Sequence, residues 1–355
     1  MTPNTVSDSR TSIGVAVVGL GYWGPNLLRV LAEDATANVL YACDKATKAT
    51  ESVNRRYPDV VTTPDFDRVL KDDNVRAVAI ATPVSTHFEL ASRALDAGKH
   101  VFVEKPLAQG VDEVEQLIEK ATQNGLVLMP GHTFIYSPPV VRIKELIDSG
   151  DLGEIYFITM SRVNLGLHQP DVSVVWDLAP HDFSILRYWL GESAETAAAA
   201  VRACIVPTTP DVAFVNLRFP SGTLAHVELS WLAPSKLRRT AIVGARRMVV
   251  YDDTSNEPVR VFDSGADLPD PESFGEYRMA YRTGDVLSLK IDPNEPLAVE
   301  LADFLSAVAG GPAPRSSPQL GLEVIRMIEG VDKSLAAGGA PVRIPQAEAV
   351  GTTKG

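Results

Sequence analysis

A lysine stands between a glutamate and a proline at the end of a short apolar run, in the order Glu104-Lys105-Pro106. The run, residues 100–103, is typical of a strand, and the proline ends it because it has no amide hydrogen to continue a ladder. Ligands of open α/β sheets bind beyond the carboxyl ends of the strands, so Lys105 would face a ligand there. Taken alone, the tripeptide is more typical of a surface turn, and its meaning depends on the residues that precede it.

A second pair of chemical groups, Asp177 and His181, lies four residues apart where a predicted helix begins, and this helix runs to about Leu190. The spacing places both side chains on one helix face. A carboxylate can orient an imidazole and raise its pKa, and histidine suits proton exchange near neutral pH. Two alternatives remain: Asp177 caps the helix and His181 is a core residue, or both bind a metal. We expect no metal, because only His132 is available as a third ligand.

A glycine pattern near the N-terminus indicates what could position these groups. The apolar run 15–18 leads into Gly19-Leu20-Gly21-Tyr22-Trp23-Gly24, which fits G-x-G-x-x-G, and a helix is predicted over 25–32. The first glycine permits the tight turn, the second lets the backbone approach a pyrophosphate, and the third allows close packing of helix on strand. The helix N-terminus adds amide donors. We therefore expect a dinucleotide site that includes Gly19, Gly21, Tyr22, Trp23 and Gly24.

The acid that this pattern requires is Asp44, after the second predicted strand and about 20 residues beyond the last glycine. Its carboxylate would accept hydrogen bonds from an adenosine ribose and would repel a 2′-phosphate, which favours NAD. Lys45 could soften that repulsion, so NADP stays an alternative, and a solvated turn is the structural alternative for Asp44. The remaining expected cofactor contacts follow later strands: Thr82, Pro83, His87, Glu104, Lys105 and Pro106.

Length and composition set wide limits. The 355 residues allow two domains, and a net charge of −12 argues against nucleic acid or an anionic membrane as partner. The N-terminus lacks the apolar core of a signal peptide, and no run approaches a membrane helix. Cys43 and Cys204 fall on separate predicted strands with no metal-ligand or redox spacing. We expect two buried thiols in a reducing cytoplasm.

Strand and helix alternate through residues 13–130, which predicts a doubly wound parallel sheet. The expected strands are 15–18, 39–43, 60–62, 77–81, 100–103 and 126–129. The expected helices are 25–32, 46–56, 65–71 with a cap near Thr63, one that ends near Ala97 before Gly98, and 111–124.

Residues 131–345 are predicted to form the second domain, with 1–12 and 346–355 as tails. After a helix over 139–149, strands are expected at 155–163, 196–205, 212–219, 224–229, 239–244 and 248–251. Ser221-Gly222 is typical of a hairpin turn. A mostly antiparallel sheet with helices on one face is the expected architecture. Two late helices, 297–308 and 320–335, could pack on either domain.

The order of these features resembles the Gfo/Idh/MocA oxidoreductase family over about residues 13–341. The resemblance implies an α/β chain, with an N-terminal Rossmann domain before an α+β domain whose large, open-faced sheet commonly mediates homodimers or homotetramers. It implies NAD or NADP, and hydride transfer at a carbon that bears a hydroxyl of a sugar, polyol or nucleotide sugar. By matching position, Lys105 resembles the catalytic lysine, His181 the proton-transfer group, and Asp177 the carboxylate that contacts the lysine or substrate. In many relatives the bond before the proline is cis, so Lys105-Pro106 is a bond to check.

Three stretches, 21–26, 131–134 and 162–166, are similar to family members in sugar and nucleotide-sugar biosynthesis. A nucleotide-linked or antibiotic-pathway sugar is therefore the expected substrate. Residues near predicted element boundaries could contact its hydroxyls or phosphate, each with a structural alternative: His132, Tyr136, Arg162 and Asn164.

A basic cluster, Lys236, Arg238 and Arg239, could receive a nucleotide diphosphate, although a solvated strand is the favoured interpretation. Other functions stay open. One is an inositol or polyol dehydrogenase, and another is a hydrolase or epimerase that oxidises its substrate transiently with tightly held NAD. A non-catalytic dinucleotide-binding sensor is a third, although a sensor has no need of a proton-transfer set.

Overall fold

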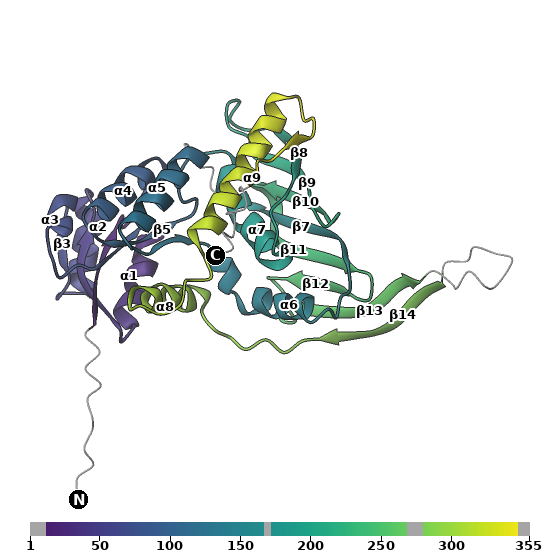
Figure 1. Ribbon diagram of the computed structural model, residues 1–355, viewed down its shortest axis with the longest axis horizontal. Helices are drawn as coiled ribbons and strands as arrows, with labels where there is room; N and C mark the ends of the chain where they lie inside the picture. The colour runs from purple at the N-terminus through teal and green to yellow at the C-terminus, as the bar shows by residue number, and fades with distance from the viewer. Residues whose placement is uncertain (1–11, 167–171, 268–279, 347–355) are drawn as a thin grey trace, which may run out of the picture. The chain divides into compact units, whose positions relative to one another are not determined.

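The computed structural model describes residues 12–166, 172–267 and 280–346 (Figure 1). The chain divides into two compact units, Met1–Thr133 with Glu295–Leu322 and Phe134–Asn294 with Glu323–Gly355. The first late helix therefore belongs to the first unit, a choice that the sequence left open. Almost all of the two expected tails lies outside the described residues.

The first unit is built on a six-stranded parallel sheet in the order β3-β2-β1-β4-β5-β6. The central strands β1 and β4 are buried along their whole length, as their uninterrupted apolar runs require. This confirms the doubly wound parallel sheet. The strands are β1 (Ile13–Val18), β2 (Ala37–Cys43), β3 (Val61–Thr63), β4 (Ala77–Ile80), β5 (His100–Glu104) and β6 (Leu128–Gly131).

Helices cover this sheet, and all but the last of them join its strands (Figure 1). They are α1 (Gly24–Glu33), α2 (Thr47–Arg56), α3 (Phe66–Leu70), α4 (His87–Asp96), α5 (Val111–Gln123) and α8 (Pro296–Val308). The expected cap of α3 near Thr63 is wrong: the side chain of Asp65 accepts the amide hydrogen of Asp67. Gly98 follows α4 with a φ of 72°, which confirms its place beyond the helix end.

Helix α8 is fixed to the first unit by apolar and polar contacts. The ring of Phe304 meets that of Phe102 on β5 edge to face, with 5.8 Å between centroids. Arg76 donates to the carbonyl oxygen of Val308 at 3.3 Å, and Arg29 on α1 forms an ion pair with Glu295. These contacts bring a segment that is distant in the sequence against β5 and α1.

The second unit contains a nine-stranded sheet in the order β14-β13-β12-β11-β7-β10-β9-β8-β15. Every pair is antiparallel except β7 with β10, so the expected, mostly antiparallel sheet is confirmed. Gly222 turns β9 into β10 with a φ of 92°, as expected for the hairpin. The strands are β7 (Ile155–Leu165), β8 (Thr196–Arg202), β9 (Val212–Arg218), β10 (Leu224–Ser230), β11 (Leu232–Gly244), β12 (Met248–Asp252), β13 (Val259–Asp267), β14 (Ala280–Ser288) and β15 (Val342–Arg343).

Helices α6 (Pro138–Asp148) and α7 (Val174–Leu190) pack on one face of this sheet (Figure 1). The indole N–H of Trp189, fully buried on α7, donates to the carbonyl oxygen of Val140 on α6 at 2.9 Å. Gly191 ends α7 in the left-handed region with a φ of 72°. Helix α9 (Pro318–Ala336) continues from the first unit into the second.

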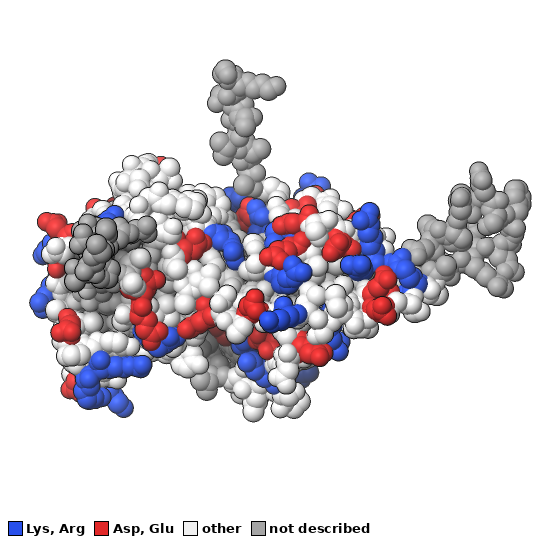
Figure 2. Space-filling view, turned by 90° about the horizontal axis from the view of Figure 1, so that it is seen from below, with Lys and Arg blue, Asp and Glu red and all other residues white. Residues whose placement is uncertain are grey.

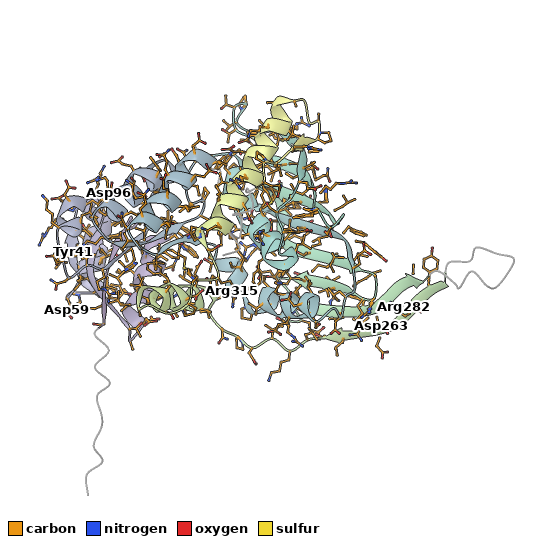
Figure 3. All side chains as sticks on the ribbon, in the orientation of Figure 1. Tyr41, Asp59, Asp96, Asp263, Arg282 and Arg315 are labelled. Atoms are coloured by element: carbon orange, nitrogen blue, oxygen red, sulfur yellow. The ribbon has the colours of Figure 1, made fainter. Side chains whose placement is uncertain are left out.

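Strands β13 and β14 were absent from the sequence expectation, because glycines and charges interrupt their apolar pattern. Gly265 and Gly284 lie within them, and glycine weakens a strand. Pairing across the hairpin compensates, and Arg282 on β14 donates to Asp263 on β13 at 3.3 Å (Figure 3). The two-residue strand β15 is too short to leave a sequence signal.

The expectation of two buried, strand-borne thiols holds for Cys43 and is wrong for Cys204, which is exposed. Strand β8 ends at Arg202, before Cys204 is reached. The carboxylate of Asp211 accepts the amide hydrogens of Cys204 and Ile205, at 2.9–3.1 Å, and so turns this backbone out of the sheet. Both thiols are free.

Acidic and basic side chains are interspersed over the face drawn in Figure 2 and do not gather by sign. Such a surface offers no extended basic field to a polyanion there. Among the described helices, none is long and apolar enough to cross a bilayer.

Candidate active site

The glycine loop has a different geometry at each of its three glycines. Gly19 has a φ of +89°, and a Cβ there would lie 2.6 Å from the carbonyl oxygen of Ala81. A Cβ on Gly24 would lie 1.9 Å from the carbonyl oxygen of Gly19. Around Gly21, by contrast, no atom lies within 4 Å of the Cβ position. Two glycines therefore let the loop pack, and the third leaves open space beside the backbone.

The open space adjoins the first turn of α1. This helix begins at Gly24 without a side-chain cap, and its first turn carries no acidic residue. Its N-terminal amides therefore have no carboxylate of their own helix as competitor for a bound anion. The loop and helix start fit the pyrophosphate of a dinucleotide.

Asp44 is held at the end of β2 by two backbone amides. Its Oδ2 accepts the amide hydrogen of Leu20 at 2.6 Å, and its Oδ1 accepts that of Ala46 at 2.7 Å. Each carboxylate oxygen keeps a further lone pair, which a ribose hydroxyl can use. This side chain therefore ties β2 to the glycine loop, and its contact with a ribose stays a prediction.

The turn that carries Lys105 is fixed by the buried side chain of His87. The two ring nitrogens lie 2.8 Å from the carbonyl oxygen of Pro106 and 2.9 Å from that of Thr82. Burial lowers the pKa of His87, although both carbonyl contacts raise it. The ring thus joins the loop after β4 to the turn after β5. The Lys105–Pro106 peptide bond is cis.

Polar side chains are also buried directly behind this turn. The Oε1 atom of Glu104 is inaccessible and has no hydrogen-bond partner among the described residues. Burial raises the pKa of Glu104 to about 7, although the charge of Lys105 opposes this rise. His132 is 1% exposed, and burial lowers the pKa of its imidazole to about 3, with a further contribution from Lys105. Near neutral pH the Glu104 carboxyl is therefore partly protonated, and the His132 imidazole is neutral.

In the second unit, Asp177 and His181 lie on α7, as the sequence predicts. Ser173 caps this helix through its side chain, so the alternative that Asp177 is the cap is wrong. The carboxylate of Asp177 accepts the indole N–H of Trp231 at 3.1 Å. The ring of His181 meets that of Phe134 edge to face, with 4.8 Å between centroids. Both side chains therefore have aromatic neighbours that fix their orientation.

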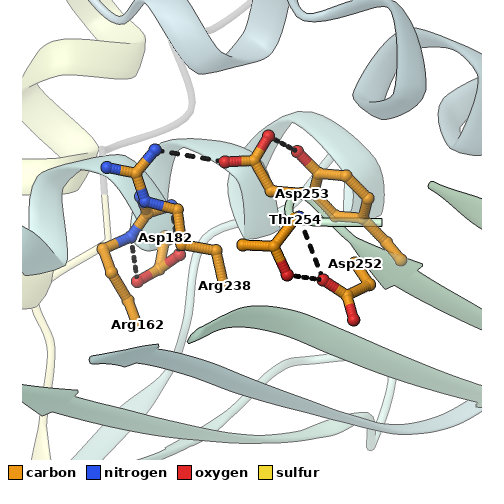
Figure 4. A network of polar contacts seen from close by, with 7 residues as sticks. Arg162, Asp182, Arg238, Asp252, Asp253 and Thr254 are labelled. Carbon is orange, nitrogen blue, oxygen red and sulfur yellow. Dashed lines mark hydrogen bonds and ion pairs between the residues drawn. The ribbon is translucent and has the colours of Figure 1, made fainter. Parts of the chain in front are cut away.

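A polar network lies next to these two residues (Figure 4). The guanidinium of Arg162 donates to both carboxylate oxygens of Asp182, at 2.9 and 2.8 Å, and both side chains are buried. Arg162 also lies over the ring of Phe134, 4.5 Å from its centroid. On the other side, Arg238 forms an ion pair with Asp253 at 3.1 Å and lies 5.4 Å from the same ring. A cavity of about 10 Å³, the size of one water molecule, adjoins the network.

The four residues expected to contact substrate lie in different surroundings. Arg162 is committed to Asp182, and His132 and Tyr136 are buried. Asn164 is half-buried near the end of β7. Substrate contact stays a prediction for each of them. The part of the chain that the structure describes contains no group of three or more His, Cys, Asp or Glu side chains that could hold a metal ion.

Two segments of the chain match known protein families. Residues 13–132 match the oxidoreductase family with the NAD-binding Rossmann fold, and residues 140–250 match the GFO/IDH/MocA C-terminal domain. The chain belongs to the GFO/IDH/MocA oxidoreductase family. It is an NAD-dependent oxidoreductase, and the glycine loop, the start of α1 and Asp44 fit that cofactor.

Relatives of this family member carry names of sugar and polyol dehydrogenases. The scyllo-inositol 2-dehydrogenase (NAD(+)) of Bacillus subtilis is 29% identical over 62% of this chain and 67% of its own length. The structure of GenD2 from gentamicin A biosynthesis in complex with NAD superposes with a TM-score of 0.81 at 24% identity, over 94% of this chain and 97% of that one. The structure of UDP-N-acetylglucosamine 3-dehydrogenase GnnA from Acidithiobacillus ferrooxidans superposes with a TM-score of 0.76 at 25% identity, over 92% of this chain and 98% of that one. For other curated relatives the matched share of their own length ranges from 58% to 97%.

Replacement of Gly21 and of Gly24 by alanine should separate ligand approach from packing. Gly21→Ala should leave the free energy of unfolding within about 0.5 kcal/mol, because its Cβ meets nothing, and should weaken NAD binding about tenfold or more. Gly24→Ala should lower the free energy of unfolding by about 1–3 kcal/mol, because its Cβ would overlap the Gly19 carbonyl. Urea unfolding and calorimetric titration with NAD measure both effects. Equal NAD affinity in Gly21→Ala and the unmodified chain would contradict the assignment of the open space.

Removal of one partner of the Arg162–Asp182 pair should lower the stability of the fold strongly. Asp182→Asn should lower the free energy of unfolding by about 3–5 kcal/mol, because a buried guanidinium loses its counter-charge. The matched control is Asp253→Asn, whose pair with Arg238 is 28% and 33% exposed and is worth about 0–1 kcal/mol. Denaturant titration of both variants gives the comparison. Equal losses would refute the structural role of the buried pair.

Proposed function

We propose that this chain transfers hydride between NAD(H) and a secondary alcohol or ketone of a sugar, preferably a nucleotide-linked or antibiotic-pathway sugar. The observation that carries the proposal is the turn at Lys105. An amine follows the carboxyl end of β5 in an NAD-binding Rossmann unit, and His87 contacts the carbonyl oxygen of the next residue, Pro106. Ligands of such sheets bind beyond this edge.

The catalytic set in this proposal is Lys105, Asp177 and His181. Bound NAD supplies the hydride acceptor. As hydride leaves the carbon, the hydroxyl proton must leave the oxygen, and Lys105 and His181 take it up or, in the reductive direction, return it. Asp177 contacts the lysine or the substrate, with its carboxylate oriented by the indole of Trp231. His181 is oriented by its edge-to-face contact with Phe134.

A second candidate substrate is a free polyol such as an inositol. The relatives named scyllo-inositol 2-dehydrogenase and myo-inositol 2-dehydrogenase, 29% and 26% identical, favour it. The sugar proposal is supported by GnnA, at 25% identity over 92% of this chain. Release and identification of any nucleotide carried by the purified protein, followed by a screen of both substrate classes for NADH formation, distinguishes them. Bound NAD with no net turnover would instead indicate transient oxidation within one catalytic cycle.

We further propose a homodimer or homotetramer formed through the uncovered face of the second unit's sheet, in the cytoplasm. Side chains of Phe157, Phe214 and Leu224 are 42–47% exposed on this face. A groove of about 560 Å³ runs beside Phe214 and the end of α9. Large apolar side chains exposed in this way are typical of an interface between copies.

Phe214→Asp should shift the chain to smaller species, because a carboxylate in an apolar interface loses its hydration. Tyr281→Asp, on the distant strand β14 and 77% exposed, is the control and should leave the assembly unchanged. Sedimentation velocity measures both. A single monomeric species in the unmodified chain would refute the oligomer.

Lys105→Ala should lower kcat by about 10²- to 10⁴-fold or more, the contribution of a general acid or base, with NAD affinity largely retained. His181→Asn should act in the same way. Lys48→Ala, an exposed lysine on α2, is the matched control and should leave kcat unchanged. Turnover close to that of the unmodified chain in Lys105→Ala would refute the catalytic assignment.

A further inference from the structure

Four buried polar atoms without hydrogen-bond partners lie in one part of the first unit. They are the Oε1 atoms of Glu104 and Glu300 and both ring nitrogens of His132, considered against all residues that the structure describes. Buried polar groups are nearly always paired, so such a concentration calls for a function or for a water molecule. The three residues, with Thr133, are termed the acid cluster below.

Three segments bring the acid cluster together. Glu104 ends β5, His132 and Thr133 follow β6, and Glu300 lies on α8. Glu300 is fully buried, and its Oε2 accepts the hydroxyl hydrogen of Thr133 at 2.6 Å. Gly131 pairs with Glu104 across β5 and β6, and a Cβ there would lie only 3.3 Å from the Glu104 carboxyl carbon. The absent side chain at Gly131 thus makes room for the carboxyl group.

The acid cluster touches the turn at Lys105. The amide of Lys105 donates to Oε2 of Glu104 at 3.3 Å. The charge of Lys105 lowers the pKa of both Glu104 and His132, so its side chain is electrostatically close to both. The two residues are therefore coupled through the backbone amide and through the charge of Lys105.

The two carboxyl groups cannot both be charged in this place, because like charges in a buried site repel strongly. Burial raises the pKa of Glu300 well above its ordinary value, and the charges of Glu104 and, to a smaller extent, Asp303 raise it further. Glu300 therefore keeps its proton. It can offer that proton to the unpartnered oxygen of Glu104, directly or through one water.

We propose that Glu104 and Glu300 form a carboxyl pair that stores the proton exchanged by Lys105. This inference rests on the proposed function, in which Lys105 exchanges a proton with the substrate. Glu104 acts through Lys105 and touches no reacting atom, and Glu300 holds Glu104 in its proton-accepting state.

In the oxidative direction the proton moves in three steps. The substrate O–H bond breaks, and its proton bonds to the amine nitrogen of Lys105. The carbon that bears this oxygen loses a hydride to NAD, and the C–O bond becomes a carbonyl. The ammonium then gives a proton to the carboxylate of Glu104, which restores the amine and leaves a carboxylic acid. Glu104 returns that proton to water. In the reductive direction each transfer is reversed, and the ketone oxygen receives the proton.

The protonation state of Glu104 sets how oxidative kcat depends on pH. Glu104 accepts a proton only when it is ionised, and burial raises its pKa to about 7. Oxidative kcat should therefore fall about tenfold per unit below about pH 7. Lys105 acts on Glu104, while Glu104 and Asp303 act on Glu300. His132, on which Lys105 also acts, is the other titratable group of the acid cluster.

The first experiment is the pH profile of kcat in four variants. Glu104→Gln should lose the inflection near pH 7. Glu300→Leu should move it upward by about one unit, because it removes the proton that Glu300 can offer to Glu104 directly or through one water, and Glu300→Gln should restore it because an amide N–H can donate. Glu119→Gln, exposed on α5, is the control and should keep the profile of the unmodified chain. An unchanged inflection in Glu104→Gln would overturn the inference.

The second experiment does not depend on turnover. Infrared spectra at rising pH should show a protonated carboxyl that persists above neutral pH and is lost in Glu300→Gln. A second carboxyl should titrate near pH 7 and be lost in Glu104→Gln. If Lys105→Ala keeps its turnover, the proposed function fails while these bands remain. If the unmodified chain shows no protonated carboxyl above neutral pH, the inference fails, whatever Lys105→Ala does.

Discussion

The tie that His87 makes between two loops is the constraint on which the proposed chemistry depends. Carbonyl oxygens only accept hydrogen bonds, and a neutral imidazole has one N–H, yet the ring of His87 faces a carbonyl on each side. One contact is therefore a hydrogen bond, and the other is close packing unless the ring takes up a second proton. In either state the width of the ring fixes the separation of the two loops. The backbone of Lys105 is thereby held relative to β4 before any ligand is bound.

Buried charge is handled in opposite ways in the two units. Arg162 and Asp182 neutralise each other with two hydrogen bonds, which hold the guanidinium over the ring of Phe134. Glu104 and Glu300 have the same sign and unpartnered oxygens, so only a retained proton makes their burial tolerable. Each unpaired buried group costs about 1–3 kcal/mol, a large share of a domain's net stability of about 5–15 kcal/mol. Such a cost is typical of a functional site and not of a stabilising core.

The nucleotide site can be predicted from the sequence because its residues lie close together along the chain. Gly19, Gly24 and Asp44 act within 25 residues of one another, and each has one physical reason for its type. Glu300 could not be found in this way, because it lies in an ordinary apolar helix about 200 residues beyond Glu104. Its role depends on which unit α8 packs against, and the apolar face of that helix suits either. Cys204 and the β13–β14 hairpin were missed for a related reason, since a single carboxylate or a cross-strand pair outweighed the local pattern.

The two candidate substrate classes differ in charge, because a nucleotide-linked sugar carries a diphosphate and a free polyol is uncharged. Arg162 is held by Asp182, and His132 is buried and neutral, so neither offers a free positive charge to a phosphate. Arg238 is partly exposed, but its guanidinium is paired with Asp253. A diphosphate bound there would have to displace that carboxylate, and a half-exposed ion pair is weak enough for an incoming anion to do so. An uncharged polyol makes no such demand and would leave the Arg238–Asp253 pair closed over Phe134, so the two substrate classes call for different states of one ion pair.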